Sequence, residues 1–181
     1  MHFKFNISLN DKDYLDYNIF CTTKSPYGKK QMQTFRVLIA VIYAFVSFLS
    51  LLARGFSADA WIGIIPYIIL LILFELLLKP FLVLILKGHI KSLKSKGKMG
   101  YSSVADMEFY DECFIETTPD NKTEQKYSAV ERVSVVADKV IYIHVNNVMS
   151  YILPLSCFES KEHYNAFLDF MRTKCTTIDV Y

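Results

Sequence analysis

The sequence contains few residues of the kinds that build catalytic and metal sites. Only four cysteines and six glycines occur in 181 residues, and no two cysteines form the C-x-x-C pair typical of zinc sites. The chain has no G-x-S-x-G, H-E-x-x-H, P-loop or glycine-rich dinucleotide motif. We therefore predict that the protein is not an enzyme and has no catalytic, cofactor or metal site. A nucleic-acid partner is not expected either.

The four histidines lie far apart in the sequence, each with different neighbours. Within Val140–Val145, His144 alternates with apolar residues, a pattern that predicts a strand with His144 on the solvent side. A nucleophilic pair between His144 and Cys113 or Cys157 stays open as an alternative, but no spacing favours it.

Two long apolar runs occupy the middle of the chain. Phe35–Ala53 has 19 residues and Trp61–Leu86 has 26, so that as helices they would extend roughly 28 Å and 39 Å. Both lengths suffice for a hydrocarbon core of about 30 Å. We predict a transmembrane hairpin over residues 35–86, with spans at 35–53 and 61–79 and a helical extension at 80–86.

Basic residues gather at the ends of this hairpin. Six lysines and no acidic residue occur between Lys79 and Gly100, whereas the rest of the chain, from Tyr101, has thirteen acidic against seven basic residues. Positive charge near span ends stays cytoplasmic, so we predict a multi-pass protein of the cell (inner or plasma) membrane with both termini in the cytoplasm. The basic juxtamembrane segment, residues 87–100, is predicted to contact the membrane surface through Lys87, Lys91, Lys94, Lys96 and Lys98.

Glu75 and Lys79 are the unusual residues inside the hairpin. They are four positions apart and therefore one turn apart on the same helix face. We predict an intramembrane ion pair between them near the cytoplasmic surface, followed by a kink at Pro80. The alternative is that Glu75 forms a proton or ion site.

The remaining segments show strand patterns and end in one amphipathic helix. Alternating apolar residues in Phe3–Leu9 predict a half-buried strand, which needs a partner sheet in the C-terminal part of the chain. Residues 101–181 read as a series of short strands closed by a helix that begins at Ser160. The expected fold is an α+β membrane protein in which a two-helix hairpin joins an N-terminal segment, 1–34, to a small cytoplasmic domain, 101–181.

Several short motifs resemble the bacterial YcxB-like family of small two-span membrane proteins. The N-terminal ones are Phe3-x-Phe5-x-Ile7, Asp13-Tyr14-x-x-Tyr17-Asn18 and Lys24-Ser25. The C-terminal ones are Tyr127, Val130-Glu131-Arg132-Val133, Tyr142, Tyr151-Ile152-x-Pro154 and Phe158. Tyr127 stands where members of the family often carry tryptophan. The resemblance implies that residues 101–181 form a PH-like domain, a curved antiparallel sheet with a C-terminal helix, and it implies an architecture rather than an activity.

These features predict a non-enzymatic integral membrane protein that holds a PH-like interaction domain at the inner membrane surface. Its expected partners are the lipid bilayer and another protein. Three alternatives stay open: an immunity protein against a membrane-active or secreted toxin, a small transport-related homo-oligomer that uses Glu75, and a sensor of lipid headgroups that uses the juxtamembrane lysines.

Overall fold

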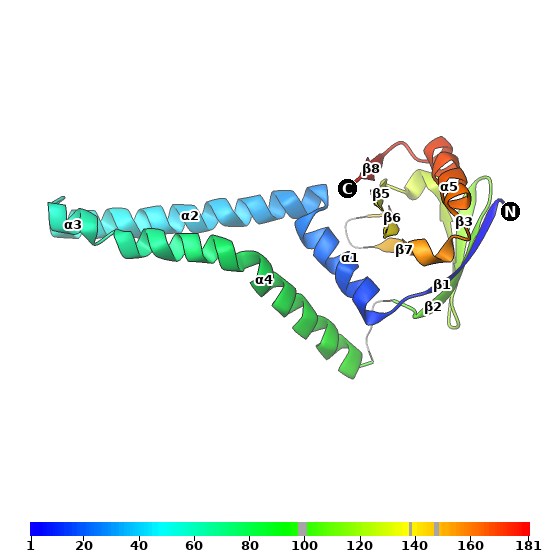
Figure 1. The fold of residues 1–181 in the computed structure, drawn as a ribbon, viewed down its shortest axis with the longest axis horizontal. Coiled ribbons are helices and arrows are strands. Elements are labelled where there is room, and N and C mark those ends of the chain that lie inside the picture. Colours follow the sequence, from blue (N-terminus) through cyan, green and yellow to red (C-terminus); the bar gives the residue numbers. More distant parts are fainter. Residues whose placement is uncertain (98–100, 138, 147–148) are drawn as a thin grey trace. The chain divides into compact units, whose positions relative to one another are not determined.

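The computed structural model describes residues 1–97, 101–137, 139–146 and 149–181. The chain divides into two compact units (Figure 1). The first unit combines Met1–Tyr17 with Lys98–Tyr181, and the second is Asn18–Gly97. The N-terminal segment therefore folds with the C-terminal domain, and the apolar hairpin is inserted between these two parts of one unit.

The first sheet of the domain has the strand order β1-β2-β3-β4 and is antiparallel throughout. It consists of β1 (Phe3–Ser8), β2 (Val104–Phe109), β3 (Cys113–Thr117) and β4 (Lys122–Lys126). Every residue of β1 is paired with one of β2, from Phe3 opposite Phe109 to Ser8 opposite Val104. The prediction that the N-terminal strand joins a C-terminal sheet is confirmed.

The second sheet has the order β7-β6-β5-β8. It consists of β5 (Arg132–Val136), β6 (Val140–His144), β7 (Ser150–Pro154) and β8 (Ile178–Val180). Strands β5, β6 and β7 are antiparallel neighbours, whereas β8 runs parallel to β5. The sequence analysis missed β8, because three residues after the closing helix are too few to show an alternating pattern.

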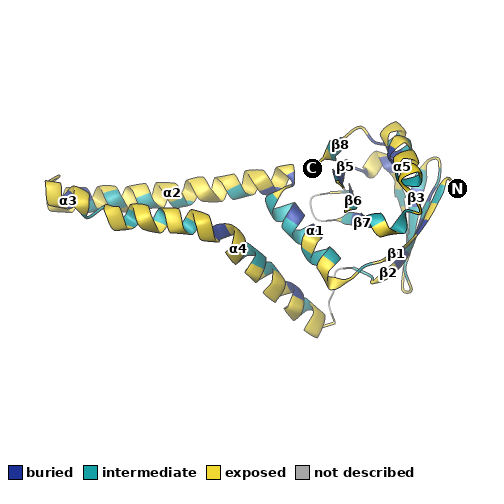
Figure 2. Cartoon of the chain, viewed as in Figure 1, coloured by how far each residue is buried: buried dark blue, intermediate teal, exposed yellow. Residues whose placement is uncertain are grey.

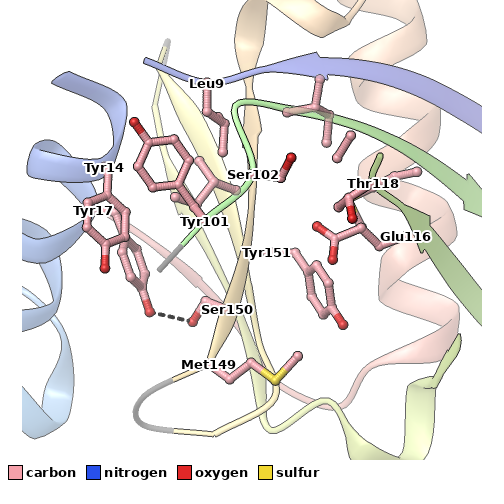
Figure 3. Close-up of a pocket in the computed structure, with 14 residues that line it drawn as sticks. Leu9, Tyr14, Tyr17, Tyr101, Ser102, Glu116, Thr118, Met149, Ser150 and Tyr151 are labelled. Carbon is pink, nitrogen blue, oxygen red and sulfur yellow. Dashed lines mark hydrogen bonds between the residues drawn. The ribbon is translucent and has the colours of Figure 1, made fainter. Parts of the chain in front are cut away.

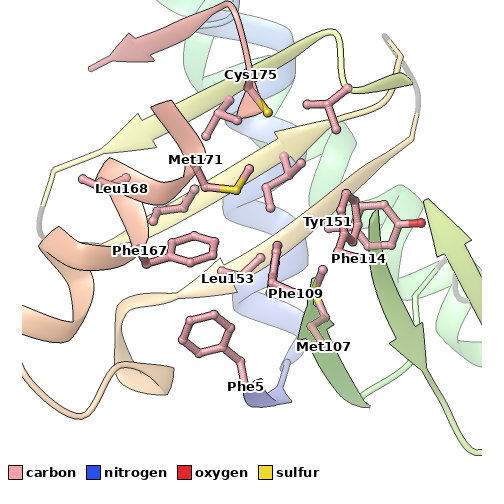
Figure 4. Packing of buried hydrophobic residues seen from close by; sticks show 14 of the residues in the cluster. Phe5, Met107, Phe109, Phe114, Tyr151, Leu153, Phe167, Leu168, Met171 and Cys175 are labelled. Carbon is pink, nitrogen blue, oxygen red and sulfur yellow. The ribbon is translucent and has the colours of Figure 1, made fainter. Parts of the chain in front are cut away.

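One aromatic core lies between the two sheets and helix α5 (Lys161–Lys174) (Figure 4). Phe5, Phe109 and Phe167 contact one another, and the ring centroids of Phe109 and Phe167 are 4.9 Å apart in an edge-to-face arrangement. Edge-to-face pairs add stability beyond the area that they bury. Ser160 caps α5 by accepting a hydrogen bond from the amide of His163, so the predicted start of this helix is confirmed. Two short 3-10 turns, Tyr127–Ala129 and Leu155–Cys157, complete the domain.

Helix α1 (Asp11–Thr23) begins in the first unit and ends in the second. The side chain of Asn10 accepts hydrogen bonds from the amides of Lys12 and Asp13, and Asp13 in turn accepts one from the amide of Asn10. This reciprocal cap fixes the start of the helix.

The second unit contains the hairpin, in which α2 (Pro26–Arg54) and α4 (Ile65–Ser95) are joined through the short helix α3 (Ala58–Ile62). Ser25 caps α2, and Gly28 lies so close to the carbonyl of Cys21 that a Cβ there would be 2.0 Å from its oxygen. Pro80 lies inside α4, and Figure 1 shows this helix bending; proline removes a backbone hydrogen bond and is a usual cause of such bends. The helix continues through residue 86 to Ser95, so the basic segment up to that residue is helical.

Most apolar side chains of the hairpin are exposed (Figure 2). The two candidate membrane spans are Pro26–Arg54 and Ala58–Ser95, and only 6% of the most apolar window of each is buried. Leu76 is 68% exposed and Leu84 65% exposed. Both helices are thus long and apolar enough to cross a bilayer. Packing within the second unit leaves most of their apolar surface exposed.

Candidate functional site

The carboxylate of Glu75 pairs with Arg36 and not with Lys79. Glu75 Oε2 lies 3.1 Å from Nε of Arg36 at the start of the first apolar run, and the neighbouring rings of Phe35 and Phe74 are 6.1 Å apart. Among the described residues no ion pair joins Glu75 to Lys79. Antiparallel packing of α2 and α4 brings the guanidinium beside Glu75, and a guanidinium matches carboxylate geometry better than an ammonium does.

The predicted membrane-surface lysines form no enclosed site. Lys87, Lys91, Lys94 and Lys96 are all exposed on the last turns of α4 or directly after it, and Lys98 lies outside the described residues. Ile90, on the same stretch, is 6% exposed. This end of α4 therefore exposes several ammonium groups, whereas its apolar side chain Ile90 is buried within the protein.

A buried polar network lies on the outer face of the second sheet. His144 is 1% exposed, so the prediction of a solvent-side histidine is wrong. Its Nδ1 is 2.6 Å from the hydroxyl of Ser150, and its Nε2 is 3.0 Å from that of Ser134. The hydroxyl of Tyr17, in α1, donates to Ser150 at 2.9 Å, and the ring of Tyr17 packs 5.3 Å from that of Tyr142. Tyr17, in the part of α1 that belongs to the first unit, packs on this face, which alternation within β6 alone could not reveal.

The network holds His144 in its neutral form. Burial and, to a smaller extent, the positive charge of Arg132 together lower its pKa to about 4. Nε2 of the imidazole faces the hydroxyl of Ser134, and Nδ1 faces that of Ser150. A base with so low a pKa is a poor proton acceptor from a serine at neutral pH, which favours a structural role for the Ser150–His144 contact.

The cysteines do not form the nucleophilic pair considered from the sequence. The thiol of Cys157 donates to the carbonyl of Pro154, and burial raises its pKa to about 11. Burial also raises the pKa of Cys113. Neither thiol is hydrogen-bonded to His144 in the described part of the chain, which also contains no group of three or more His, Cys, Asp or Glu that could hold a metal.

A cavity of about 350 Å³ opens where β1, α1, β2, β3 and β7 meet (Figure 3). All the described residues that line it belong to the first unit. Its apolar wall includes Ile7, Leu9 and Met107, and its aromatic wall includes Tyr14, Tyr17 and Tyr101. The cavity depends on the N-terminal segment, which supplies Ile7 from β1, Leu9 directly after it, and Tyr14 and Tyr17 from α1.

The aromatic wall of the cavity is held by local contacts. The rings of Tyr14 and Tyr101 stack with centroids 4.7 Å apart, and the hydroxyl of Tyr101 donates to the carboxylate of Asp11 at 3.2 Å. Burial and this hydrogen bond both raise the pKa of Tyr101. The tyrosine therefore stays neutral and lies beside a negative charge.

The opposite wall carries two polar groups without partners. Glu116 is the last inward-facing residue of β3, opposite Thr123 of β4, and among the described residues its carboxylate makes no hydrogen bond or ion pair. Burial raises its pKa. The hydroxyl of Tyr151 is also buried without a hydrogen-bond partner in the described ranges, and burial together with the charge of Glu116 raises its pKa to about 12.

This cavity is not predictable from the sequence. Tyr14, Tyr17, Tyr101 and Tyr151 come from three distant parts of the chain, and only the pairing of β1 with β2 brings them together. The one available signal was Glu116, a charged residue two positions after Phe114, which places it on the same face of its strand as a core phenylalanine.

Comparison with known proteins gives a family match for the domain. No curated protein matches the chain, and no solved structure does. Residues 109–171, from the last residue of β2 into α5, match the family described as YcxB-like protein. This stretch contains Glu116, His144 and Tyr151. The resemblance noted in the sequence is therefore confirmed over residues 109–171, which are similar to the YcxB-like family.

Proposed function

We propose that this protein is a membrane-anchored binding module, in which the hairpin crosses the bilayer and holds the domain at one membrane face. The observation that carries the proposal is that the domain is built from the segments of the chain before and after the hairpin. Strand β1 precedes the hairpin and β2 follows it, yet all six residues of β1 pair with β2. An even number of spans returns the chain to the side from which it entered, as this pairing requires.

Exposure of the hairpin supports its insertion. Monomeric soluble proteins rarely expose large contiguous apolar patches, whereas a lipid-facing helix is expected to do so. The basic residues flanking the hairpin support a cytoplasmic position for both termini and a location in the cell membrane. The exposed lysines at the end of α4 support contact with anionic lipid, to which each contributes about 1 kcal/mol.

The domain itself supports a binding role rather than catalysis. Two sheets, antiparallel except for the parallel pairing of β8 with β5, and a closing helix are compatible with the PH-like architecture that the family resemblance implies. The cavity between β1, α1 and β7 offers a site for a ligand or for a side chain of a partner protein. Glu75 already has a partner, Arg36, within the hairpin, so no observation favours a transport role for it.

Thiol labelling of intact and permeabilised cells tests the proposal. The native cysteines are replaced, and single cysteines are introduced at Asp59→Cys, between the two long helices, and at Asp120→Cys, in the turn between β3 and β4. We expect a membrane-impermeant maleimide to label Asp59→Cys in intact cells and Asp120→Cys only after permeabilisation. Labelling of both in intact cells, or release of the chain from membranes by alkaline carbonate, would contradict the proposal.

A further inference from the structure

We propose that the cavity between β1, α1, β3 and β7 binds an organic cation, an ammonium group on a short chain, with Glu116 as its counter-ion and the tyrosines as its aromatic wall. This inference rests on the proposed function in one respect, that the domain is a binding module. It does not depend on insertion of the hairpin or on its orientation.

The charges around the cavity select a cation. Glu116 is the charged side chain of the described lining, and no lysine, arginine or histidine of the described chain joins it there. A second carboxylate, Asp11, lies directly behind Tyr101. An anionic ligand would be repelled by both carboxylates. An apolar ligand would displace water from Glu116 without offering the carboxylate a new hydrogen bond or ion pair. Glu116 is already half-buried, and further desolvation of an unpaired carboxylate by a guest is costly, so a cation is the guest that this wall accepts at least cost.

The aromatic wall selects an organic cation over a metal ion. The faces and edges of Tyr14, Tyr17 and Tyr101 border the cavity (Figure 3). Aromatic rings attract ammonium groups through their quadrupole, and this attraction grows when the cation is desolvated. A hard metal ion would instead require several oxygen ligands, and Glu116 is the one carboxylate that the described lining supplies.

The hydroxyl of Tyr151 provides the independent observation. Tyr151 is 4% exposed, and its oxygen has no partner among the described residues, although buried hydroxyl groups are usually satisfied. Glu116 is close enough for its charge to act on Tyr151, yet no hydrogen bond joins them. An acceptor and a hydroxyl both left without partners on one cavity wall indicate that a guest with N–H or O–H groups completes the site.

The test uses the full chain in nanodiscs of phosphatidylglycerol, a lipid whose headgroup carries no ammonium. The probe is choline, and its neutral isostere, 3,3-dimethylbutan-1-ol, is the control ligand with the same shape. Binding is followed by calorimetry and by tyrosine fluorescence. We expect saturable choline binding and an affinity for the isostere lower by about tenfold. Equal binding of the two, or no saturable choline binding, would overturn the inference.

Variants locate the binding. Glu116→Gln is expected to weaken choline binding by about tenfold, and Tyr14→Leu, on the opposite wall, to weaken it severalfold. The matched control is Glu112→Gln, which removes the same charge from the exposed turn between β2 and β3 and should leave binding unchanged. Unchanged binding in both site variants, each with a normal thermal transition, would overturn the inference.

A lipid arm identifies the source of the cation. Phosphatidylcholine in the nanodiscs is expected to weaken the apparent affinity for free choline if the site takes lipid headgroups, and to leave it unchanged if the site takes a soluble amine. Either result is compatible with the proposed chemistry. Choline binding by a chain that carbonate releases from membranes would refute the proposed anchoring while leaving this inference intact.

Discussion

Phe5 in β1 is 1% exposed, whereas Phe45 in α2 is 61% exposed. The same contrast runs through the two units. In the domain, large side chains such as Phe109, Phe114 and Phe167 are fully buried, and in the hairpin Leu76 and Leu84 are largely exposed. Both units are rich in apolar residues, but only the domain uses them to build an interior.

The contrast is the one expected if the hairpin crosses a bilayer, as we propose, while the domain lies in water. Burial of apolar surface stabilises a domain in water by about 25 cal/mol per Å². The domain therefore gains stability by packing its apolar side chains against one another in a common core. A helix in lipid gains nothing by hiding leucine from its solvent, and its packing depends on close contacts and on polar pairs. The Arg36–Glu75 pair is the hairpin's polar contact of this kind.

The largest difference between the units should appear when a phenylalanine is truncated in each. Phe5→Ala should lower the free energy of unfolding of the domain by about 3–5 kcal/mol, because Phe5 contacts Phe109, Phe158 and Phe167. Phe45→Ala should lower it by less than about 0.5 kcal/mol. Near-UV circular dichroism of the full chain during denaturation measures both. Deletion of Phe3–Leu9 should have a larger effect than either, and an unchanged protease resistance of the domain after this deletion would refute the role of β1.

The next largest effect is a pH dependence that only the domain shows. The pKa of His144 is lowered from its ordinary value of 6.5 to about 4 in the folded state. As the pH falls, His144 is therefore protonated in the unfolded chain before it is protonated in the folded chain. The contribution of His144 is therefore fully present above about pH 6.5 and is lost as the pH falls toward 4, by about 3 kcal/mol.

The variant His144→Gln isolates this contribution, because glutamine keeps hydrogen-bonding groups near Ser134 and Ser150 but does not titrate. The stability difference between wild type and variant should shrink between pH 6.5 and pH 4, measured by thermal unfolding of the full chain. A constant difference over this range would show that His144 is not held neutral by burial.

His144 also shows where prediction from the sequence ends. Alternation in β6 correctly separated Ile141 and Ile143 from His144, but it could not tell which outer faces are covered by other elements. The strand pattern of Phe3–Leu9, the helix start at Ser160 and the two apolar helices were predictable because each depends on local residues. The packing of Tyr17 on the face that carries His144, the partner of Glu75 and the cavity depend on contacts between distant segments.

A smaller effect is expected from two buried tyrosines of the domain. The hydroxyl of Tyr127 donates a hydrogen bond to the carbonyl of Tyr110 at 3.0 Å, whereas the hydroxyl of Tyr151 has no partner among the described residues. Both residues are buried, Tyr127 being 6% and Tyr151 4% exposed. Tyr127→Phe should cost about 1 kcal/mol, and Tyr151→Phe should be neutral or stabilising by up to about 1 kcal/mol. Denaturation of both variants without added amine checks this, and an equal cost for both would mean that the hydroxyl of Tyr151 is satisfied in the free protein.

The smallest effect lies in the hairpin, and it distinguishes the two candidate partners of Glu75. A double-mutant cycle of Arg36→Gln with Glu75→Gln should give a coupling of about 0.2–1 kcal/mol in detergent, because both side chains are about half exposed. The matched cycle of Lys79→Gln with Glu75→Gln should give no coupling, although Lys79 is one turn from Glu75 on the same helix. Thermal stability of the helical signal measures both cycles. Coupling of Glu75 to Lys79 and not to Arg36 would instead support the ion pair predicted from the sequence. It would also mean that no ion pair stabilises the contact between α2 and α4, which would then depend on packing alone.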